Sequence, residues 1–253
     1  DAALTTSNDI YEIRKVLDKN INKGIDSEES LIKILIQAND LSDDDILNNF
    51  LTIFLAGVGT TSHWMTNTIY LIQKNPDCKR KLYDEIDKYF SPQENFEENL
   101  NEKVIKNNPP YLSSVMKEAL RFYSPVPDIF PRVAIKDHML GDIKVKKGTI
   151  LGICLISNML SEDYFPNPSQ FKPERWIENP KLESEINSFA YIPFSSGSRN
   201  CLGQHMSKLE SKIIMAAFLR KYNFEVINIG SQVWTYAFGY QTLEPIIVEL
   251  TEK

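Results

Sequence analysis

The sequence contains few cysteines, no surplus of positive charge and no long uninterrupted apolar run. Its three cysteines are odd in number and form no C-x-x-C pair, which argues against a disulfide framework or a zinc ribbon and favours a reducing environment. The 28 basic and 34 acidic residues give a net charge of −6, so we do not expect nucleic acid as a partner. The 42% hydrophobic and 25% charged residues that are present are typical of a globular protein.

One stretch, residues 46–73, contains no Asp, Glu, Lys or Arg and could be mistaken for a membrane span. Eleven of its 28 residues are polar, whereas a spanning helix needs about 20 mostly apolar residues. We therefore expect a long helix within a soluble core. The sequence begins with Asp1 and shows no signal-like segment, so we expect a fragment or a processed piece.

The first half of the sequence has helical periodicity. Charged amphipathic stretches at 8–20 and 30–38 precede Ser42, a candidate N-cap that three aspartates follow. Apolar and small residues at spacings of three and four then predict one long helix over 43–74, which Pro76 ends. Further helices are expected from the same kind of pattern, at 76–90 and 111–123.

The second half reads differently, with short strand-like segments and one more helix. Strands are expected at 133–135, 139–145, 149–155, 222–228 and 245–250. A last helix should follow the Ser- and Gly-rich loop 195–203, and its apolar face carries Leu202, Met206, Leu209, Ile213 and Ala216. This order predicts a mainly α protein with small β elements, of the α+β class.

The segment from Phe194 to Gly203 carries the strongest chemical signal, since a lone cysteine ends a flexible loop just before an amphipathic helix. The helix dipole and free backbone N–H groups there favour the thiolate of Cys201. Gly197 permits a positive φ, Gly203 lets a large group approach the backbone, and Arg199 suits an anionic group such as a carboxylate. A single thiolate without further sulfur or imidazole ligands fits an axial bond to heme iron better than zinc or an iron–sulfur cluster.

Two other interpretations of Cys201 remain open at this point. The loop could be a Gly/Ser turn in which the cysteine is an incidental small hydrophobe, as free cysteines often are. Alternatively, the cysteine could be a nucleophile, for which the sequence offers only His63, His138 and His205 as bases.

Four segments resemble the cytochrome P450 family of heme-thiolate oxygenases, in the family's own order. The cysteine loop fits F-x-x-G-x-R-x-C-x-G without a mismatch, and 118–121 (EALR) resembles the family's E-x-x-R pair. Residues 171–176 (FKPERW) are similar to F-x-P-E-R-F, and 56–61 (AGVGTT) resemble the A-G-x-[DE]-T-T stretch of the long central helix. The resemblance implies that 1–253 is a partial P450 domain, the C-terminal half, because family members are about twice as long.

By this resemblance the protein binds heme b (iron protoporphyrin IX), with Cys201 as the thiolate ligand of the iron. Arg199 and Arg132 match positions that hold the heme propionates, although for Arg132 a surface ion pair remains an alternative. Phe194 would pack beside the cysteine and shield its sulfur. The other implied cofactor-binding positions are Gly197, Gly203 and Ala56.

The resemblance also implies a structural network and a distal site. Glu118, Arg121 and Arg175 match the family's buried Glu–Arg–Arg network, which is structural rather than catalytic. In the distal site, Gly57 would open the long helix and Thr60 would relay protons, whereas a mid-helix Thr can also bond back to its own helix.

The distal site departs from the family pattern at one position, since Gly59 stands where the family usually has an acid for proton delivery. Water, His63 or Asp128 would then deliver the protons, or the chemistry needs none. Substrate contacts are expected from the turn after the E-x-x-R helix and from the C-terminal turn, at Val126, Ile129, Phe130, Phe238 and Tyr240.

The function implied is a monooxygenase that oxidises a small apolar substrate with O2 and with electrons from NADPH, delivered by a flavoprotein reductase or a small redox protein. Lys208 and Lys212 could belong to a basic docking face for that donor, or to a solvated helix face. The alternatives are a heme-thiolate isomerase or dehydratase of hydroperoxides and a truncated chain unable to hold heme. Membrane attachment would come only through the N-terminal part. The expected location is the endoplasmic reticulum membrane if the parent is a eukaryotic member, and the cytoplasm otherwise.

Overall fold

The structure is a computed structural model that describes residues 34–35, 37, 40–90, 108–232, 234–236, 240–242 and 244–253. The chain divides into two compact units, 1–58 and 59–253, and each is considered by itself. The predicted helices at 8–20 and 30–38 lie outside the described residues, except that 34, 35 and 37 are helical.

The first unit contains the start of the long helix α3 (Asp43–Lys74), whose bounds confirm the prediction. Ser42 caps it, because its hydroxyl accepts the backbone N–H of Asp45 at 3.2 Å, while its own N–H donates to the Asp45 carboxylate at 3.0 Å. The helix continues without a break through Gly57 and Gly59.

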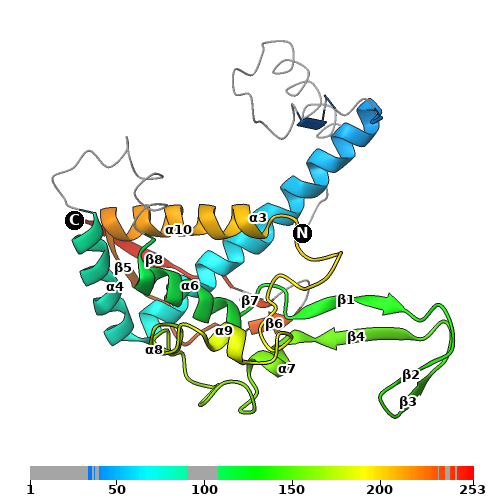
Figure 1. Cartoon of the computed structure of the whole chain (residues 1–253). Helices are drawn as coiled ribbons and strands as arrows, with labels where there is room; N and C mark the ends of the chain where they lie inside the picture. The colour runs from blue at the N-terminus through cyan, green and yellow to red at the C-terminus, as the bar shows by residue number, and fades with distance from the viewer. Residues whose placement is uncertain are drawn as a thin grey trace. The chain divides into compact units, whose positions relative to one another are not determined.

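Three further helices of the second unit enclose the main core (Figure 1): α4 (Pro76–Tyr89), α6 (Pro110–Phe122) and α10 (Gln204–Lys221). Their apolar faces meet the part of α3 that begins at Trp64. The N-terminus of α6 is satisfied from α4, since both oxygens of the Glu85 carboxylate accept backbone N–H groups of Tyr111 and Leu112 at 2.8 Å. The largest fully buried apolar side chains of this core include Ile72, Leu82, Ile86, Phe90, Leu112, Met116, Met215, Leu219 and Phe224.

A second, smaller core is formed by residues between positions 155 and 191. It gathers Leu155 and Met159 of the short helix α7 (Leu155–Met159) with Phe165, Trp176 and Tyr191. The short helices α8 (Arg175–Glu178) and α9 (Leu182–Glu185) belong to the same region. This second core is joined to α6 by the polar cluster described below.

A β-ribbon extends away from the helices of the second unit (Figure 1). Strand β1 (Asp128–Val133) pairs antiparallel with β4 (Ile150–Cys154), with a bulge between Ile129 and Arg132. The expected strand at 139–145 is wrong as a single element, because Gly141, at φ +58°, turns the chain between β2 (His138–Leu140) and β3 (Ile143–Val145). The strand predicted at 133–135 ends at Val133 and begins five residues earlier than expected.

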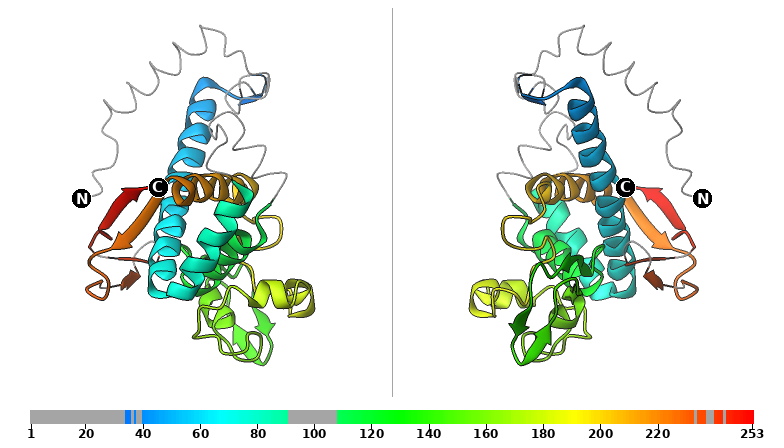
Figure 2. Two further views of the ribbon diagram at one scale, coloured as in Figure 1. Left: turned by 90° about the vertical axis from the view of Figure 1, so that its left-hand side faces the viewer. Right: turned by 90° about the vertical axis from the view of Figure 1, so that its right-hand side faces the viewer.

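The C-terminal part forms two more ribbons, one of which is clearly separate at the side of the helices in Figure 2. In that ribbon β5 (Tyr222–Val226) pairs with β8 (Val248–Glu252), which confirms both predicted tail strands with small shifts. Strands β6 (Trp234–Tyr236) and β7 (Tyr240–Thr242) form the other ribbon and were not predicted. The fold is therefore mainly α with small β elements, as predicted.

The apolar face predicted for the last helix is only partly buried. Ala216 is buried, but Leu202, Met206 and Leu209 are exposed, with 85% of Leu202 accessible. The helix instead buries Ser211, Met215 and Leu219 against the core, on another side. Among the described residues, no helix has both the length and the hydropathy of a membrane span.

Candidate functional site

The cysteine loop is closed on itself by backbone hydrogen bonds. The N–H of Cys201 donates to the Phe194 carbonyl at 2.9 Å, and the N–H of Asn200 donates to the Gly197 carbonyl at 3.1 Å. Two positive φ angles, +62° at Ser195 and +84° at Gly197, make the reversal possible. The Cys201 thiol is free and exposed, two residues before Gly203, the N-cap of α10.

The loop geometry gives a prediction for Gly197. A Cβ at this position would meet open space, so the cost of Gly197→Ala comes from its left-handed backbone conformation alone, about 1–2 kcal/mol. We expect urea unfolding to show this loss. Ser196→Ala is the matched control, because Ser196 is an exposed neighbour without a positive φ, and it should change the unfolding free energy by less than about 0.5 kcal/mol. Equal effects of the two variants would contradict this account of the turn.

Phe194 is held in place by residues of two helices. Its ring lies edge-on to Trp64 of α3, with centroids 6.1 Å apart, and the Lys208 ammonium of α10 lies 5.0 Å from its centroid. Trp64 is fixed in turn, because its indole N–H donates to the Met116 carbonyl of α6 at 3.0 Å. The loop is therefore anchored to the main core at the residue that closes onto Cys201.

The α3 helix also contacts the start of α10. The hydroxyls of Thr61 and Ser207 are 3.1 Å apart. Thr60, the residue before Thr61, is half-buried. Burial lowers the pKa of half-buried His63, because an apolar environment disfavours the charged imidazolium. Ala56 and Gly57 are exposed residues of α3 in the first unit.

Glu118, Arg121 and Arg175 lie together in one buried cluster, as the resemblance implied. Arg121 donates to both oxygens of the fully buried Glu118 carboxylate, from Nε at 3.0 Å and from Nη2 at 2.8 Å. Arg175 Nε donates to the same carboxylate at 3.0 Å. Both guanidinium groups also reach backbone carbonyls, those of Met159 and Pro168 for Arg121 and that of Pro166 for Arg175. The cluster thus ties α6 to the segment that precedes α8.

Two further donors to Glu118 were missed by the sequence analysis. The Trp176 indole N–H donates to Oε2 at 2.9 Å, and the Lys172 backbone N–H donates to Oε1 at 3.0 Å. Both residues fall inside the segment that carries the family resemblance, but side-chain identity alone does not reveal which N–H groups turn inward. The carboxylate is therefore saturated with donors, as a buried charge requires.

The remaining predicted residues are spread over the second unit. Arg199 is exposed in the cysteine loop, and Arg132 is an exposed residue of β1 beside the bulge. Val126 is half-buried before β1, and Ile129 and Phe130 are residues of that strand. Phe238 lies outside the described residues, and Tyr240 begins β7.

The donor chemistry of the cysteine loop fits a heme iron. In the part of the chain that the structure describes, no group of three or more His, Cys, Asp or Glu side chains could hold a metal ion. A heme iron would need one ligand from the protein here, and the exposed Cys201 thiol would supply a donor of the right chemistry. A Cβ at Gly203 would meet open space, and the nearby residues Leu202 and Met206 have exposed apolar side chains.

Comparison with known proteins identifies the family. The family model for Cytochrome P450 matches residues 5–239. The chain is 32% identical over 214 residues to "Probable cytochrome P450 4d20" of Drosophila melanogaster, which covers 83% of the chain and 40% of that protein. It is 35% identical over 186 residues to "Cytochrome P450 4V2" of Mus musculus, which covers 74% of the chain and 34% of that protein.

The fold comparison agrees with the sequence comparison. The crystal structure of the cytochrome P450DA heme domain superposes with a TM-score of 0.83 at 22% identity, covering 98% of this chain and 54% of that one. The chain therefore spans about 40% of the length of the curated relatives and about half of the solved one. With the family model, the relatives and the fold in agreement, the chain belongs to the cytochrome P450 family.

Proposed function

We propose that the chain provides the heme-thiolate centre of a monooxygenase that oxidises a small apolar substrate. The oxidant is O2, and the electrons come from NADPH through a flavoprotein reductase or a small redox protein. The observation that carries this proposal is the free, exposed Cys201 thiol in a loop closed onto Phe194. Membership of the family supports this class of reaction.

The residues of the loop have separate tasks in this proposal. Heme, when bound, supplies the oxygen-activating chemistry. Cys201 holds the iron through its thiolate, and the Phe194 ring, fixed by Trp64, keeps water away from the sulfur. Arg199 and Arg132 bind the propionates through charge-assisted hydrogen bonds. Gly197 and Gly203 shape the loop.

The distal tasks fall to α3. Thr60 holds a proton on its hydroxyl and passes it toward the reacting oxygen. Val126, half-buried before β1, contributes to the apolar substrate pocket in this proposal. The Glu118 cluster holds α6 against the segment 166–176 and takes no part in the chemistry.

One observation favours a second reaction. Gly59 precedes Thr60 where the family usually has an acid, so the chain lacks the expected carboxylate for proton delivery. A heme-thiolate isomerase or dehydratase of hydroperoxides needs no delivered protons and no reductant. We therefore keep it as the alternative.

The discriminating experiment compares two turnovers of the hemin-loaded protein, one with NADPH, reductase and O2 and one with a fatty hydroperoxide alone. Monooxygenation predicts product only in the first. It also predicts that Thr60→Val lowers the product formed per NADPH about fivefold and raises the release of hydrogen peroxide. A fivefold change corresponds to about 1 kcal/mol, the contribution of one hydrogen bond. Thr60→Ser, which keeps the hydroxyl, should restore coupling. Hydroperoxide turnover without reductant, unaffected by Thr60→Val, would support the alternative instead.

A further inference from the structure

The helix α3 touches the chain on both sides of Cys201. After the cysteine, Thr61 of α3 and Ser207 of α10 share a hydrogen bond between their hydroxyls, whose oxygens are 3.1 Å apart. Before the cysteine, the ring of Trp64 lies edge-on to that of Phe194, with centroids 6.1 Å apart. Because Thr61 and Trp64 are three residues apart, neighbouring positions on one side of α3 make both contacts.

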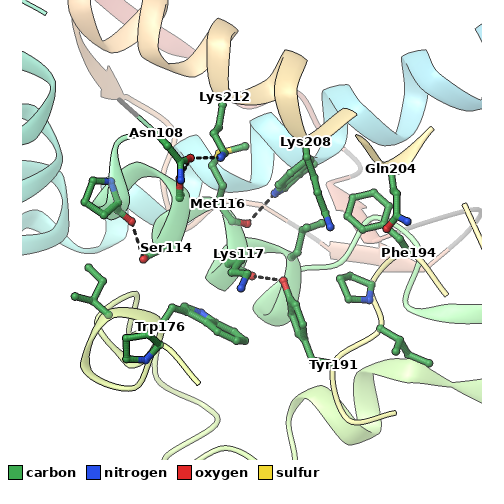
Figure 3. A pocket seen from close by; sticks show the side chains of 18 of the residues that line it. Asn108, Ser114, Met116, Lys117, Trp176, Tyr191, Phe194, Gln204, Lys208 and Lys212 are labelled. Atoms are coloured by element: carbon green, nitrogen blue, oxygen red, sulfur yellow. Dashed lines mark hydrogen bonds between the residues drawn. The ribbon is translucent and has the colours of Figure 1, made fainter. Parts of the chain in front are cut away.

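Both contacts reach backbone that is hydrogen-bonded close to the cysteine. The Phe194 carbonyl accepts the N–H of Cys201 at 2.9 Å, and the N–H of Ser207 donates to the carbonyl of Gly203 at 2.8 Å. Figure 3 shows the Phe194 ring beside Lys208 of α10, whose ammonium group lies 5.0 Å from the ring centroid. The cysteine is therefore held between two segments that α3 contacts directly.

The hydroxyl of Thr61 differs from others on the same helix in what it contacts. The hydroxyls of Ser62 and Thr68 donate to backbone carbonyls of α3 itself, as hydroxyls in the middle of a helix usually do. The Thr61 hydroxyl reaches Ser207 of another helix instead, and the Thr61 residue is only 7% exposed. Loss of this hydrogen bond would leave a hydroxyl that water replaces poorly.

The start of α10 has little other packing to hold it. Between positions 204 and 210, only Gln204 and Ser207 are partly buried, and the other residues are exposed. The fully buried residues of this helix begin at Ser211. The hydrogen bond from Thr61 to Ser207 is thus one of few contacts that fix this end of α10.

We propose that Thr61 and Ser207 are positioning residues, which fix the place of Thr60 relative to Cys201. The inference rests on the proposed function, in which Thr60 passes a proton toward the reacting oxygen. That step needs the Thr60 hydroxyl at a defined place, since a proton is passed only over hydrogen-bond distance. Thr60 and Thr61 share a peptide bond, so a shift of Thr61 away from α10 also shifts Thr60.

The first measurement is hydrogen exchange of the hemin-free protein over residues 207–210 of α10. We expect Thr61→Val to speed exchange there about fivefold, the equivalent of one lost hydrogen bond, although the substitution lies on another helix. Thr61→Ser, which keeps the hydroxyl, should restore the rate. Thr68→Val is the matched control, because it removes a buried hydroxyl of α3 that donates within the helix, and it should leave exchange over 207–210 unchanged.

The second measurement is the product formed per NADPH by the hemin-loaded protein. Thr61→Val and Ser207→Ala should each lower it about threefold. The double variant should lower it no further, because both substitutions remove the same hydrogen bond. Thr61→Ser should restore the coupling, whereas Thr68→Val should leave it unchanged even if the protein becomes less stable.

Several results would overturn the inference. Exchange that Thr61→Val leaves unchanged would show that the contact does not hold the start of α10. Faster exchange with unchanged product per NADPH would give the contact a structural role only, and an approximately ninefold loss in the double variant would show that the two hydroxyls act separately. Failure of the proposed function itself looks different, since the unaltered protein would then form no product with NADPH, and the positioning role would fall with it.

Discussion

Arg121→Met is expected to lower the free energy of unfolding by about 3–5 kcal/mol, because it leaves the Glu118 carboxylate buried without its main partner. Arg121 is itself fully buried and donates to carbonyls of Met159 and Pro168, which also lose their donor. Arg175→Met should act in the same direction, but less strongly, because Arg175 makes one hydrogen bond to the carboxylate rather than two. Urea unfolding followed by circular dichroism measures both.

The matched control for this prediction is an exposed ion pair on a helix. Arg80 lies 3.6 Å from Asp84 in α4, at a spacing of four residues, and both side chains are well exposed to solvent. Arg80→Met removes the same kind of charge and should change the unfolding free energy by less than about 0.5 kcal/mol. If Arg121→Met costs no more than Arg80→Met, the cluster is not the structural support that its burial indicates.

Cys201→Ser is expected to abolish the thiolate-type band in the reduced carbon-monoxide difference spectrum of the hemin-loaded protein. The serine hydroxyl is a poor substitute for a thiolate at iron, so hemin should also bind at least about tenfold more weakly, a loss of about 1.4 kcal/mol. The fold should remain, because the Cys201 side chain is exposed and the loop is closed through its backbone N–H.

Cys154→Ser controls for the chemistry of replacing a cysteine. Cys154 is also free and exposed, at the end of β4, so its loss removes an equivalent thiol from another element. The spectrum and the hemin affinity of this variant should match those of the unaltered protein. A band that persists in Cys201→Ser and disappears in Cys154→Ser would show that the ligand has been misassigned.

The sequence predicted the elements whose signals are local. The bounds of α3 follow from the Ser42 cap, the aspartates behind it and Pro76, and all three act within a few residues of the helix ends. The loop 194–203 was recognised as a candidate site because glycine, arginine and cysteine occur there at fixed spacings. These features need no knowledge of distant contacts.

Other features depend on contacts that a pattern does not contain. The strand expected at 139–145 splits into a hairpin because Gly141 adopts a positive φ, which glycine permits but does not require. Trp176 could be read as a core aromatic, yet its indole N–H serves Glu118. The apolar stripe expected on the last helix is mostly exposed, Met206 included, because the contacts of α10 with the core bury another side of the helix.

The most direct test of the central claim is an iron-edge X-ray absorption spectrum of the hemin-loaded protein. With Cys201 as the ligand, the iron has a sulfur neighbour in the unaltered protein and in Cys154→Ser, and none in Cys201→Ser. A spectrum with only nitrogen and oxygen neighbours in the unaltered protein, or a sulfur neighbour that survives in Cys201→Ser, would contradict the claim.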